Sequence, residues 1–294
     1  MTVIPTPARK LDPKVRFALG DALFTELIAT TREAKGRPVI AGLCGPQGSG
    51  KSTTAGRLVQ RLEASGYRVA SLSLDDFYLT HAERGQLSRD VHPLLATRGV
   101  PGTHDTGLLT DALNALLNAN DDAAIALPGF DKASNDRLPQ EEWRVHRGPA
   151  DIVLLEGWCV GARPQHPDSL AEPVNTLERD EDRDGIWRRF VNDRLGDAYA
   201  LAFATLDLNI LLRAPSFGCI HRWRSEQEAG LSRERPGASA AMDATAIARF
   251  VAHYERLTRW LMVDEPAQLV ADLGDDRSPL GWRPRVAEDA ASER

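Results

Sequence analysis

The chain has 294 residues, of which 42% are hydrophobic and 27% are charged, and its formal net charge is -6. It can bury a sizeable core, and no linker-like stretch divides it into two cores, so we expect one large domain. The acidic balance argues against duplex nucleic acid as a partner. No apolar run reaches the ~18 residues of a transmembrane helix, and residues 1–16 lack the apolar core of a secretory signal, so we expect a cytoplasmic protein without a membrane partner.

The first predicted elements are a helix over residues 13–34 and a buried strand over residues 39–43. A glycine-rich loop follows, and residues 53–64 then carry apolar side chains at helical spacing. The loop fits the phosphate-binding pattern G-x-x-x-x-G-K-[ST], and strand, loop and helix occur in the order that this pattern requires. Its residues are Gly45, Pro46, Gln47, Gly48, Ser49, Gly50, Lys51 and Ser52.

Glycines let successive backbone N–H groups turn towards a phosphate, and the following helix adds the positive end of its dipole. We therefore expect residues 45–53, from Gly45 to Thr53, to bind a nucleotide. Lys51 is expected to reach the β- and γ-phosphates, and Ser52 is expected to bind Mg²⁺. The alternative is an incidental glycine turn.

Two adjacent carboxylates, Asp75 and Asp76, follow the second predicted strand, residues 68–74, and precede Tyr78. A carboxylate placed near the γ-phosphate can orient an acceptor hydroxyl and take its proton. We therefore predict Asp75 as the catalytic base, with Asp76 and Tyr78 in the acceptor site. The alternative is an acidic turn after a strand, where aspartate is common.

Two later loops combine cations, carboxylates and imidazole. The first covers residues 98–105, and the second begins at residue 128, after a predicted strand over residues 123–127. Both suit a small polar or anionic acceptor, although either can be a solvated surface loop. The predicted acceptor-binding residues are Arg98, His104, Asp105, Asp131 and Lys132.

The strand predicted over residues 152–155 leads directly to Glu156, as in a Walker B element. We expect Glu156 to contribute to catalysis by holding Mg²⁺ directly or through water. A polar residue that simply ends a strand is the alternative, but its carboxylate would be buried unpaired.

Arginines are concentrated after the last strong strand, residues 208–212. Arg213, Arg222 and Arg224 can clamp phosphates as a lid, because guanidinium groups hold phosphates bidentately. They can also pair with Glu226 and Glu228 on a solvated helix.

Alternating helices and strands predict an α/β chain with the P-loop NTPase fold, a doubly wound, mainly parallel sheet with helices on both faces. Three segments break the alternation and are expected to be inserted acceptor and lid segments: 77–104, 164–197 and 215–236. The three cysteines, Cys44, Cys159 and Cys219, have no metal-ligand spacing and are expected to be buried in a protein of a reducing compartment. We divide the chain into an N-terminal helical extension (1–36), a kinase-like P-loop domain (37–275) and a flexible tail (276–294).

Over residues 38–265 the sequence resembles the P-loop small-molecule kinases related to phosphoribulokinase, uridine kinase and bacterial pantothenate kinase. Within this group it is similar to D-glycerate 3-kinase and its bacterial and fungal relatives. The family's D-x-F-[YH] segment matches Asp75 to Tyr78, with Asp76 at the variable position. The other matching segments are Arg98-Gly99 with Thr103-His104-Asp105, Phe130-Asp131-Lys132-Ala133, Leu155-Glu156-Gly157-Trp158, Arg222-Trp223-Arg224 with Gln227-Glu228, and Phe250-Val251 with Tyr254.

This resemblance implies a transferase that uses ATP and Mg²⁺ to phosphorylate D-glycerate to 3-phosphoglycerate, with Asp75 as the base. The sequence leaves two alternatives open, a related kinase for pantothenate, a nucleoside or a sugar, and a nucleotide-dependent switch protein. The acceptor loops hold cations and few aromatics, which favours an acidic small-molecule substrate over a nucleoside. The chain has no N-K-x-D segment of the kind with which GTPases read their base.

Overall fold

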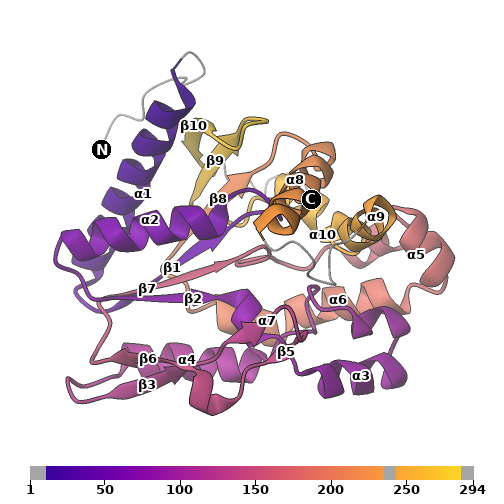
Figure 1. Ribbon diagram of the computed structural model, residues 1–294, viewed down its shortest axis with the longest axis horizontal. Helices are drawn as coiled ribbons and strands as arrows, with labels where there is room; N and C mark the ends of the chain where they lie inside the picture. The colour runs from indigo at the N-terminus through magenta and orange to yellow at the C-terminus, as the bar shows by residue number, and fades with distance from the viewer. Residues whose placement is uncertain (1–10, 235–242, 286–294) are drawn as a thin grey trace, which may run out of the picture.

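Six strands form the central sheet in the order β10-β9-β8-β1-β7-β2 (Figure 1). The computed structural model describes residues 11–234 and 243–285. Within the sheet β2, β7, β1, β8 and β9 run parallel, and β10 pairs antiparallel with β9. The strands are β1 (Val39–Cys44), β2 (Val69–Ser73), β7 (Ile152–Gly157), β8 (Leu208–Arg213), β9 (Leu269–Leu273) and β10 (Pro279–Pro284).

Helices cover both faces of this sheet. Every residue of β1 and β7 is buried, as expected for parallel strands enclosed on two sides. One face packs against α1, α2 and α8, through side chains such as Phe24 and Leu58, and the other packs against α4, α7 and α10, through side chains such as Leu113 and Leu257. The helices are α1 (Pro13–Lys35), α2 (Lys51–Ala64), α3 (His81–Asp90), α4 (Thr106–Leu117), α5 (Thr176–Glu181), α6 (Ile186–Gly196), α7 (Ala198–Phe203), α8 (Phe217–Glu234), α9 (Ala244–Ala252) and α10 (Glu255–Asp264).

This arrangement confirms the predicted α/β P-loop fold and its doubly wound, mainly parallel sheet. Helix α1, which the sequence placed in an extension, lies against the sheet and buries Phe24 and Ile28 in the core. Its ends are well defined, because the Asp12 side chain accepts a hydrogen bond from the Lys14 N–H, and Gly36 closes the helix in the left-handed region.

The strand predicted over residues 123–127 lies outside the central sheet, which corrects its expected place. It forms β3 (Ala124–Leu127), which pairs antiparallel with β6 (Arg144–Arg147) in a separate two-stranded sheet. The exposure of β3 agrees with this position outside the central sheet, because only Leu127 of its four residues is buried. A shorter hairpin, β4 (Phe130–Asp131) with β5 (Asp136–Arg137), follows and carries Lys132 on its loop.

The predicted tail is also corrected, because residues 279–284 form β10 at the edge of the sheet. A turn closed by the N–H of Gly274 donating to the carbonyl of Ser278 (2.9 Å) joins it to β9. Trp282 then packs into the core beside α1, so burial of one large side chain holds this polar segment in place. Residues 286–294 lie outside the described residues.

The charged segment 164–197 forms part of a small satellite core. Leu94, Leu95 and Val100 pack there against Leu177 and Trp187. Two buried ion pairs fix the segment, Glu178 with Arg256 (2.6 Å) and Asp182 with Arg188 (3.1 Å). The segment therefore packs against the loop that contains Arg98 and Val100.

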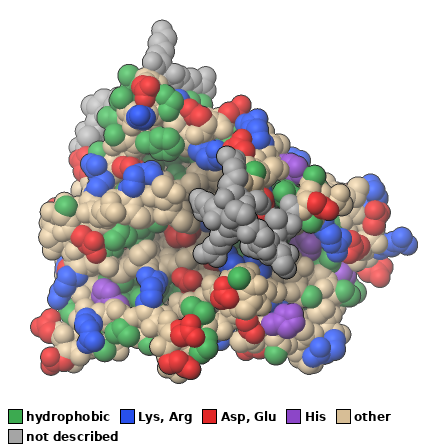
Figure 2. Space-filling view, in the orientation of Figure 1, with side chains coloured by type: hydrophobic (Ala, Val, Ile, Leu, Met, Phe, Trp, Pro, Cys, Tyr) green, Lys and Arg blue, Asp and Glu red, His purple; other side chains and the backbone are tan. Residues whose placement is uncertain are grey.

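Figure 2 shows Lys and Arg side chains interspersed with Asp and Glu over one face. Among the described residues, no helix has the length and apolar character needed to cross a membrane. The three cysteines are free and buried, as predicted.

Candidate functional site

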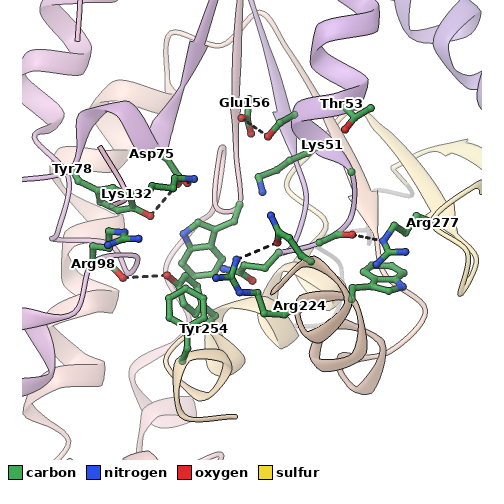
Figure 3. A pocket seen from close by; sticks show the side chains of 18 residues that line it. Lys51, Thr53, Asp75, Tyr78, Arg98, Lys132, Glu156, Arg224, Tyr254 and Arg277 are labelled. Atoms are coloured by element: carbon green, nitrogen blue, oxygen red, sulfur yellow. Dashed lines mark hydrogen bonds and ion pairs between the residues drawn. The ribbon is translucent and has the colours of Figure 1, made fainter. Parts of the chain in front are cut away.

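A cavity of about 380 Å³ opens at the carboxyl ends of β1, β7 and β2 (Figure 3). This is the edge where parallel α/β sheets bind ligands. In Figure 3, Asp75, Lys132 and Arg98 lie on one side of the view and Arg277 on the other, with Glu156 and Lys51 above Arg224 in the middle. The lining residues are Gln47, Gly48, Gly50, Lys51, Ser52, Thr53, Asp75, Tyr78, Arg98, Lys132, Glu156, Trp158, Trp223, Arg224, Gln227, Phe250, Tyr254 and Arg277.

The glycine-rich loop forms the phosphate side of the cavity. Gly48 and Gly50 adopt φ angles of 73° and 85°, which favour glycine, and Gly50 is the N-cap of α2. Because the N-cap is a glycine, it has no side chain to accept from the N–H groups of the first turn of α2. Gly45, Pro46 and Ser49 shape the loop but do not line the cavity. The arrangement matches an anion site at a helix N-terminus.

Glu156 stands at the end of β7 directly beside the phosphate loop. Its Oε1 accepts hydrogen bonds from the hydroxyls of Ser52 (2.8 Å) and Ser73 (3.0 Å). Its Oε2 is buried and has no partner among residues 11–234 and 243–285. A buried carboxylate oxygen without a donor is costly, and an oxygen ligand set of this kind suits Mg²⁺. Ser52 and Glu156 therefore fit a magnesium site that nucleotide phosphates would complete.

Asp75 lies across the cavity, in the short 3₁₀ helix that follows β2. Its Oδ1 accepts from the hydroxyl of Tyr78 (3.0 Å), and its Oδ2 accepts from Nζ of Lys132 (2.7 Å). Burial raises the pKa of this carboxyl, but the charges of Lys132 and Lys51 and the hydrogen bond from Lys132 outweigh burial and lower the pKa to about 2. Asp75 is thus ionised, and both of its oxygens have partners.

Asp76, its neighbour, is oriented differently and does not line the cavity. Its nearest cation is Arg144, 4.0 Å away. Burial raises the pKa of Asp76 to about 6, with Arg144 opposing this rise and the charge of Asp75 adding to it. The two adjacent carboxyls therefore have pKa values shifted in opposite directions, and only Asp75 faces the cavity.

Arg98 is held at the cavity by its backbone as well as by its side chain. Its carbonyl accepts from the hydroxyl of Tyr254 (3.1 Å), and the next carbonyl, of Gly99, accepts from Nε1 of Trp158 (2.8 Å). Its guanidinium donates to Oδ1 of Asn135 and lies 5.5 Å from the ring centre of Phe130. Gly99 has φ 138°, and a Cβ there would overlap the Tyr254 ring.

Three predicted acceptor residues do not reach the cavity. The ring of His104 is buried between Tyr78 and Tyr199, and its centroid lies 4.4 Å from that of the stacked Tyr78 ring. This burial lowers the pKa of His104 to about 4. Asp105 caps α4 by accepting from the Leu108 N–H (2.9 Å). Asp131 accepts from the N–H groups of Ala133 and Ser134 in the hairpin turn. Local backbone groups thus occupy Asp105 and Asp131, whereas Nδ1 of His104 shares a hydrogen bond with the hydroxyl of Tyr199 (2.6 Å).

Of the three predicted lid arginines, only Arg224 lines the cavity. It donates to Glu228 and lies 4.8 Å from the ring centre of Phe250. Arg213 pairs with Asp272 (2.6 Å) and Glu265 (3.3 Å), and Arg222 pairs with Asp275 (3.2 Å). The lid expectation is therefore corrected for Arg213 and Arg222, whose carboxylate partners come from residues 265–275.

Arg277 was missed, because the sequence analysis assigned it to the tail. Its Nε donates to the carbonyl of Gly48 (2.7 Å), and its Nη2 pairs with Glu226 (2.5 Å). Its guanidinium lies 5.4 Å from the ring centre of Trp223. A Cβ on Gly48 would lie 2.7 Å from that of Trp223, so α8 and the β9–β10 turn close tightly on the phosphate loop. An apolar run ends in Gly274, and apolar and polar residues then alternate up to Trp282. This pattern is typical of a β-hairpin and could have predicted that Arg277 lies in an ordered turn.

Aromatic residues line the cavity without having been predicted as site residues. They are Trp158, Trp223, Phe250 and Tyr254, and they come from three segments that the family resemblance had marked. Tryptophan, phenylalanine and tyrosine are also common in protein cores, so residue type alone does not distinguish these four from core residues.

Comparisons with known proteins agree with this geometry. The sequence profile of the family described as Methylmalonyl Co-A mutase-associated GTPase MeaB matches residues 18–80, which contain the phosphate loop. The D-glycerate 3-kinase of chloroplasts from Arabidopsis thaliana is 26% identical over 258 residues, covering 83% of this chain and 54% of that protein. This chain therefore spans about half the length of the Arabidopsis protein.

A solved structure, D-glycerate 3-kinase from Cryptococcus neoformans var. grubii, superposes with a TM-score of 0.77 at 26% identity, covering 90% of this chain and 99% of that one. The uncharacterized kinase mug58 of Schizosaccharomyces pombe is 36% identical over 230 residues, covering 75% of this chain and 79% of that protein. The chain therefore belongs to the P-loop kinase group that contains this fission-yeast protein and is related to D-glycerate 3-kinase, uridine kinase and pantothenate kinase, and it is an ATP-dependent small-molecule kinase.

Proposed function

We propose that the protein transfers the γ-phosphoryl group of Mg-ATP to a hydroxyl of D-glycerate and forms 3-phosphoglycerate. The observation that carries this proposal is the composition of one cavity, in which Asp75 and the cations Lys132 and Arg98 face the phosphate loop. A carboxylate can take the hydroxyl proton, and the two cations complement the carboxylate of a small hydroxy acid. The likeness to two proteins named D-glycerate 3-kinase supports the same substrate.

On the phosphate side, Lys51 and the N–H groups of the loop would bind the nucleotide phosphates. Ser52 and Glu156 would hold Mg²⁺, which fits the buried and unpartnered Oε2 of Glu156. What Mg²⁺ supplies when bound is neutralisation of the charge on the β- and γ-phosphates. Among the described residues, no group of three or more His, Cys, Asp or Glu side chains could hold a metal by itself, so the phosphates would have to complete the site.

On the acceptor side, Asp75 would orient the acceptor hydroxyl. The hydroxyl oxygen forms a bond to the γ-phosphorus, the bond from that phosphorus to the β–γ bridging oxygen breaks, and its electron pair leaves with ADP. The hydroxyl proton passes to Asp75 and then to solvent. Arg98 would hold the acceptor carboxylate, and Arg224, beside Phe250, would approach the phosphates from α8.

The test is ADP release from Mg-ATP with D-glycerate, L-glycerate, pantothenate, uridine or ribulose 5-phosphate, with the product identified by phosphorus NMR. We expect stimulation by D-glycerate and formation of 3-phosphoglycerate, and loss of both in Lys51→Ala. Turnover with a different acceptor would keep the kinase and replace the substrate. Silence with every acceptor would contradict the proposal.

We also propose that the protein works in the cytoplasm. The support is that all three cysteines are buried and free, as in proteins of reducing compartments. Fractionation of cells that produce the full chain would test this, and recovery from another compartment would contradict it.

A further inference from the structure

The contact between Asp75 and Lys132 conflicts with the role proposed for Asp75. A base takes the proton of the acceptor hydroxyl across a hydrogen bond of about 2.6–3.2 Å, and a cation bound to the accepting oxygen lowers the basicity of that oxygen. Oδ1 accepts from Tyr78 at 3.0 Å, and Oδ2 accepts from Lys132 at 2.7 Å. Tyr78 is 3% exposed and is packed between His104 and Phe130, so this partner is fixed. Each oxygen accepts one hydrogen bond, but only Oδ2 is bound to a cation, so Oδ2 becomes a stronger proton acceptor when Lys132 moves away.

Lys132 is built to move without disturbing its surroundings. Its side chain is 63% exposed, and among the described residues its ammonium forms an ion pair with Asp75 alone. Its backbone is held, because the preceding Asp131 accepts two N–H bonds in the hairpin turn. The hairpin is anchored in turn by Arg137, which donates to the carbonyl of Tyr78 (3.0 Å) and to Asp105 (3.2 Å). A lysine side chain has several rotatable bonds, so its ammonium can change partner while the hairpin stays fixed.

Arg98, the second cation of the acceptor side, differs from Lys132 in this respect. Its guanidinium is bound to Asn135 and lies over Phe130, and its carbonyl is bound by Tyr254. An anionic acceptor that enters the cavity therefore meets one fixed cation and one exchangeable cation. Exchange of Lys132 from Asp75 to the acceptor leaves the number of ion pairs unchanged, whereas a neutral acceptor offers Lys132 no replacement partner.

We propose that Lys132 is a specificity-determining residue that covers Oδ2 of Asp75 until an anionic group on the acceptor draws it away. This inference rests on the proposed function and deepens it. The acceptor class is a small hydroxy acid, in which one group carries the charge that removes Lys132 and another carries the hydroxyl that approaches the freed oxygen. Neutral hydroxyl compounds, water included, leave the base covered. The low pKa of Asp75 in the free protein agrees with the covered state.

The test compares the wild type with Lys132→Met and with Arg144→Met, a matched control. Arg144 is 61% exposed and lies 4.0 Å from the neighbouring carboxylate of Asp76, outside the cavity. Each protein is assayed for ATP hydrolysis without an acceptor, for phosphorylation of glycerol, and for phosphorylation of D-glycerate. Binding of Mg-ATP, measured on the same preparations, shows that the nucleotide side is intact.

We expect Lys132→Met to raise ATP hydrolysis and glycerol phosphorylation by ~10-fold or more, because Oδ2 is free for a neutral acceptor. Its kcat/KM for D-glycerate should fall by ~10- to 100-fold, because a charged contact is lost. Arg144→Met should stay within about twofold of the wild type in all three assays. A lysine that only bound the acceptor carboxylate would give the loss with D-glycerate and no gain with neutral acceptors.

Two outcomes separate this inference from the proposed function. If the wild type does not use D-glycerate but Lys132→Met hydrolyses ATP faster, the exchange stands and the substrate assignment fails. If the wild type uses D-glycerate and Lys132→Met gains nothing with water or glycerol, the substrate stands and the exchange is overturned.

Discussion

The phosphate side of the cavity is made by one continuous segment and the end of one strand, whereas the acceptor side is assembled from distant segments. On the phosphate side, residues 45–53 present backbone N–H groups beside Glu156. On the acceptor side, Asp75 comes from the 3₁₀ helix after β2, and Arg98 and Lys132 come from two separate loops. Their positions depend on side-chain contacts from Tyr78, Tyr254 and Asn135.

This difference determines which substitutions each side of the cavity tolerates. A loop held by backbone conformation keeps its shape when neighbouring side chains vary, because the glycines and the helix N-terminus define it. A site held by side-chain contacts changes whenever one of the supporting residues changes. We therefore expect substrate choice within this fold to vary through the acceptor side, while nucleotide binding stays constant.

The largest expected effect distinguishes the two adjacent carboxylates of the acceptor side. Asp75→Asn should lower kcat by ~10³-fold, because proton transfer to the carboxylate is lost. ATP binding should be unchanged, since Asp75 lies opposite the phosphate loop. Asp76→Asn should lower kcat by less than about tenfold, because Asp76 does not line the cavity. Steady-state kinetics with a nucleotide-binding assay would measure both, and the reverse ranking would make Asp76 the base.

On the phosphate side, the substitution that tests the proposed magnesium site is Glu156→Gln. We expect the magnesium concentration for half-maximal turnover to rise by ~10- to 100-fold, because the free Oε2 loses its charge. Ser73→Ala is the control, since it removes only one hydrogen bond to Oε1 and should change this concentration by less than about threefold. A magnesium titration of ADP release measures the shift. Equal magnesium requirements in Glu156→Gln and the wild type would exclude Glu156 as a ligand.

A third change tests how tightly the acceptor loop is packed. Gly99→Ala should reduce the free energy of unfolding by ~2–3 kcal/mol, because φ is 138° and the new Cβ overlaps the Tyr254 ring. Gly56→Ala, inside α2 with open space around it, should instead raise stability by ~0.5–1 kcal/mol. Urea unfolding of both variants measures the difference. Equal stabilities would show that the loop yields easily and that Arg98 is not firmly held.

The smallest expected effect is a pH dependence of stability at Asp76. Its pKa rises from 3.8 to about 6 on folding, so the folded state holds this proton more tightly than the unfolded state. The wild type therefore loses stability as the pH rises from about 4 to about 6, and Asp76→Asn avoids that loss. The stability gained by Asp76→Asn should be on the order of 2 kcal/mol larger at neutral pH than near pH 4, after a discount for partial exposure. Urea unfolding at both pH values tests this, and a pH-independent gain would contradict it.

Much of the fold could be predicted because its signals are local. The buried strands β1, β2, β7 and β8 and the helix over 13–34 follow from apolar periodicity, and the glycine loop fixes the order of elements. The place of β3 could not be predicted, because Ala124 to Leu127 is short and leaves open which strand it pairs with. The hairpin β9–β10 was missed because Arg277, Arg283 and two prolines made residues 276–285 resemble a tail.

The site was predictable where a residue's role depends on its own segment. Lys51, Ser52 and Glu156 lie where the loop and strand patterns place them. Arg213 and Arg222 could not be separated from Arg224, since all three share a short, arginine-rich stretch and only tertiary contacts decide which one faces the cavity. Arg277 reaches Gly48 from a distant part of the chain, and no local pattern encodes that contact.

The order of strands has a consequence for synthesis of the protein on the ribosome. β1 and β2 are not neighbours in the sheet, because β7 lies between them, and Glu156 of β7 joins Ser52 to Ser73. Between translation of Cys44 and Gly157, on the order of 10 s pass at ordinary elongation rates. After β2 is made, the nascent chain carries two apolar strands without their shared partner until β7 emerges, and chaperones that bind exposed strands can act in this time.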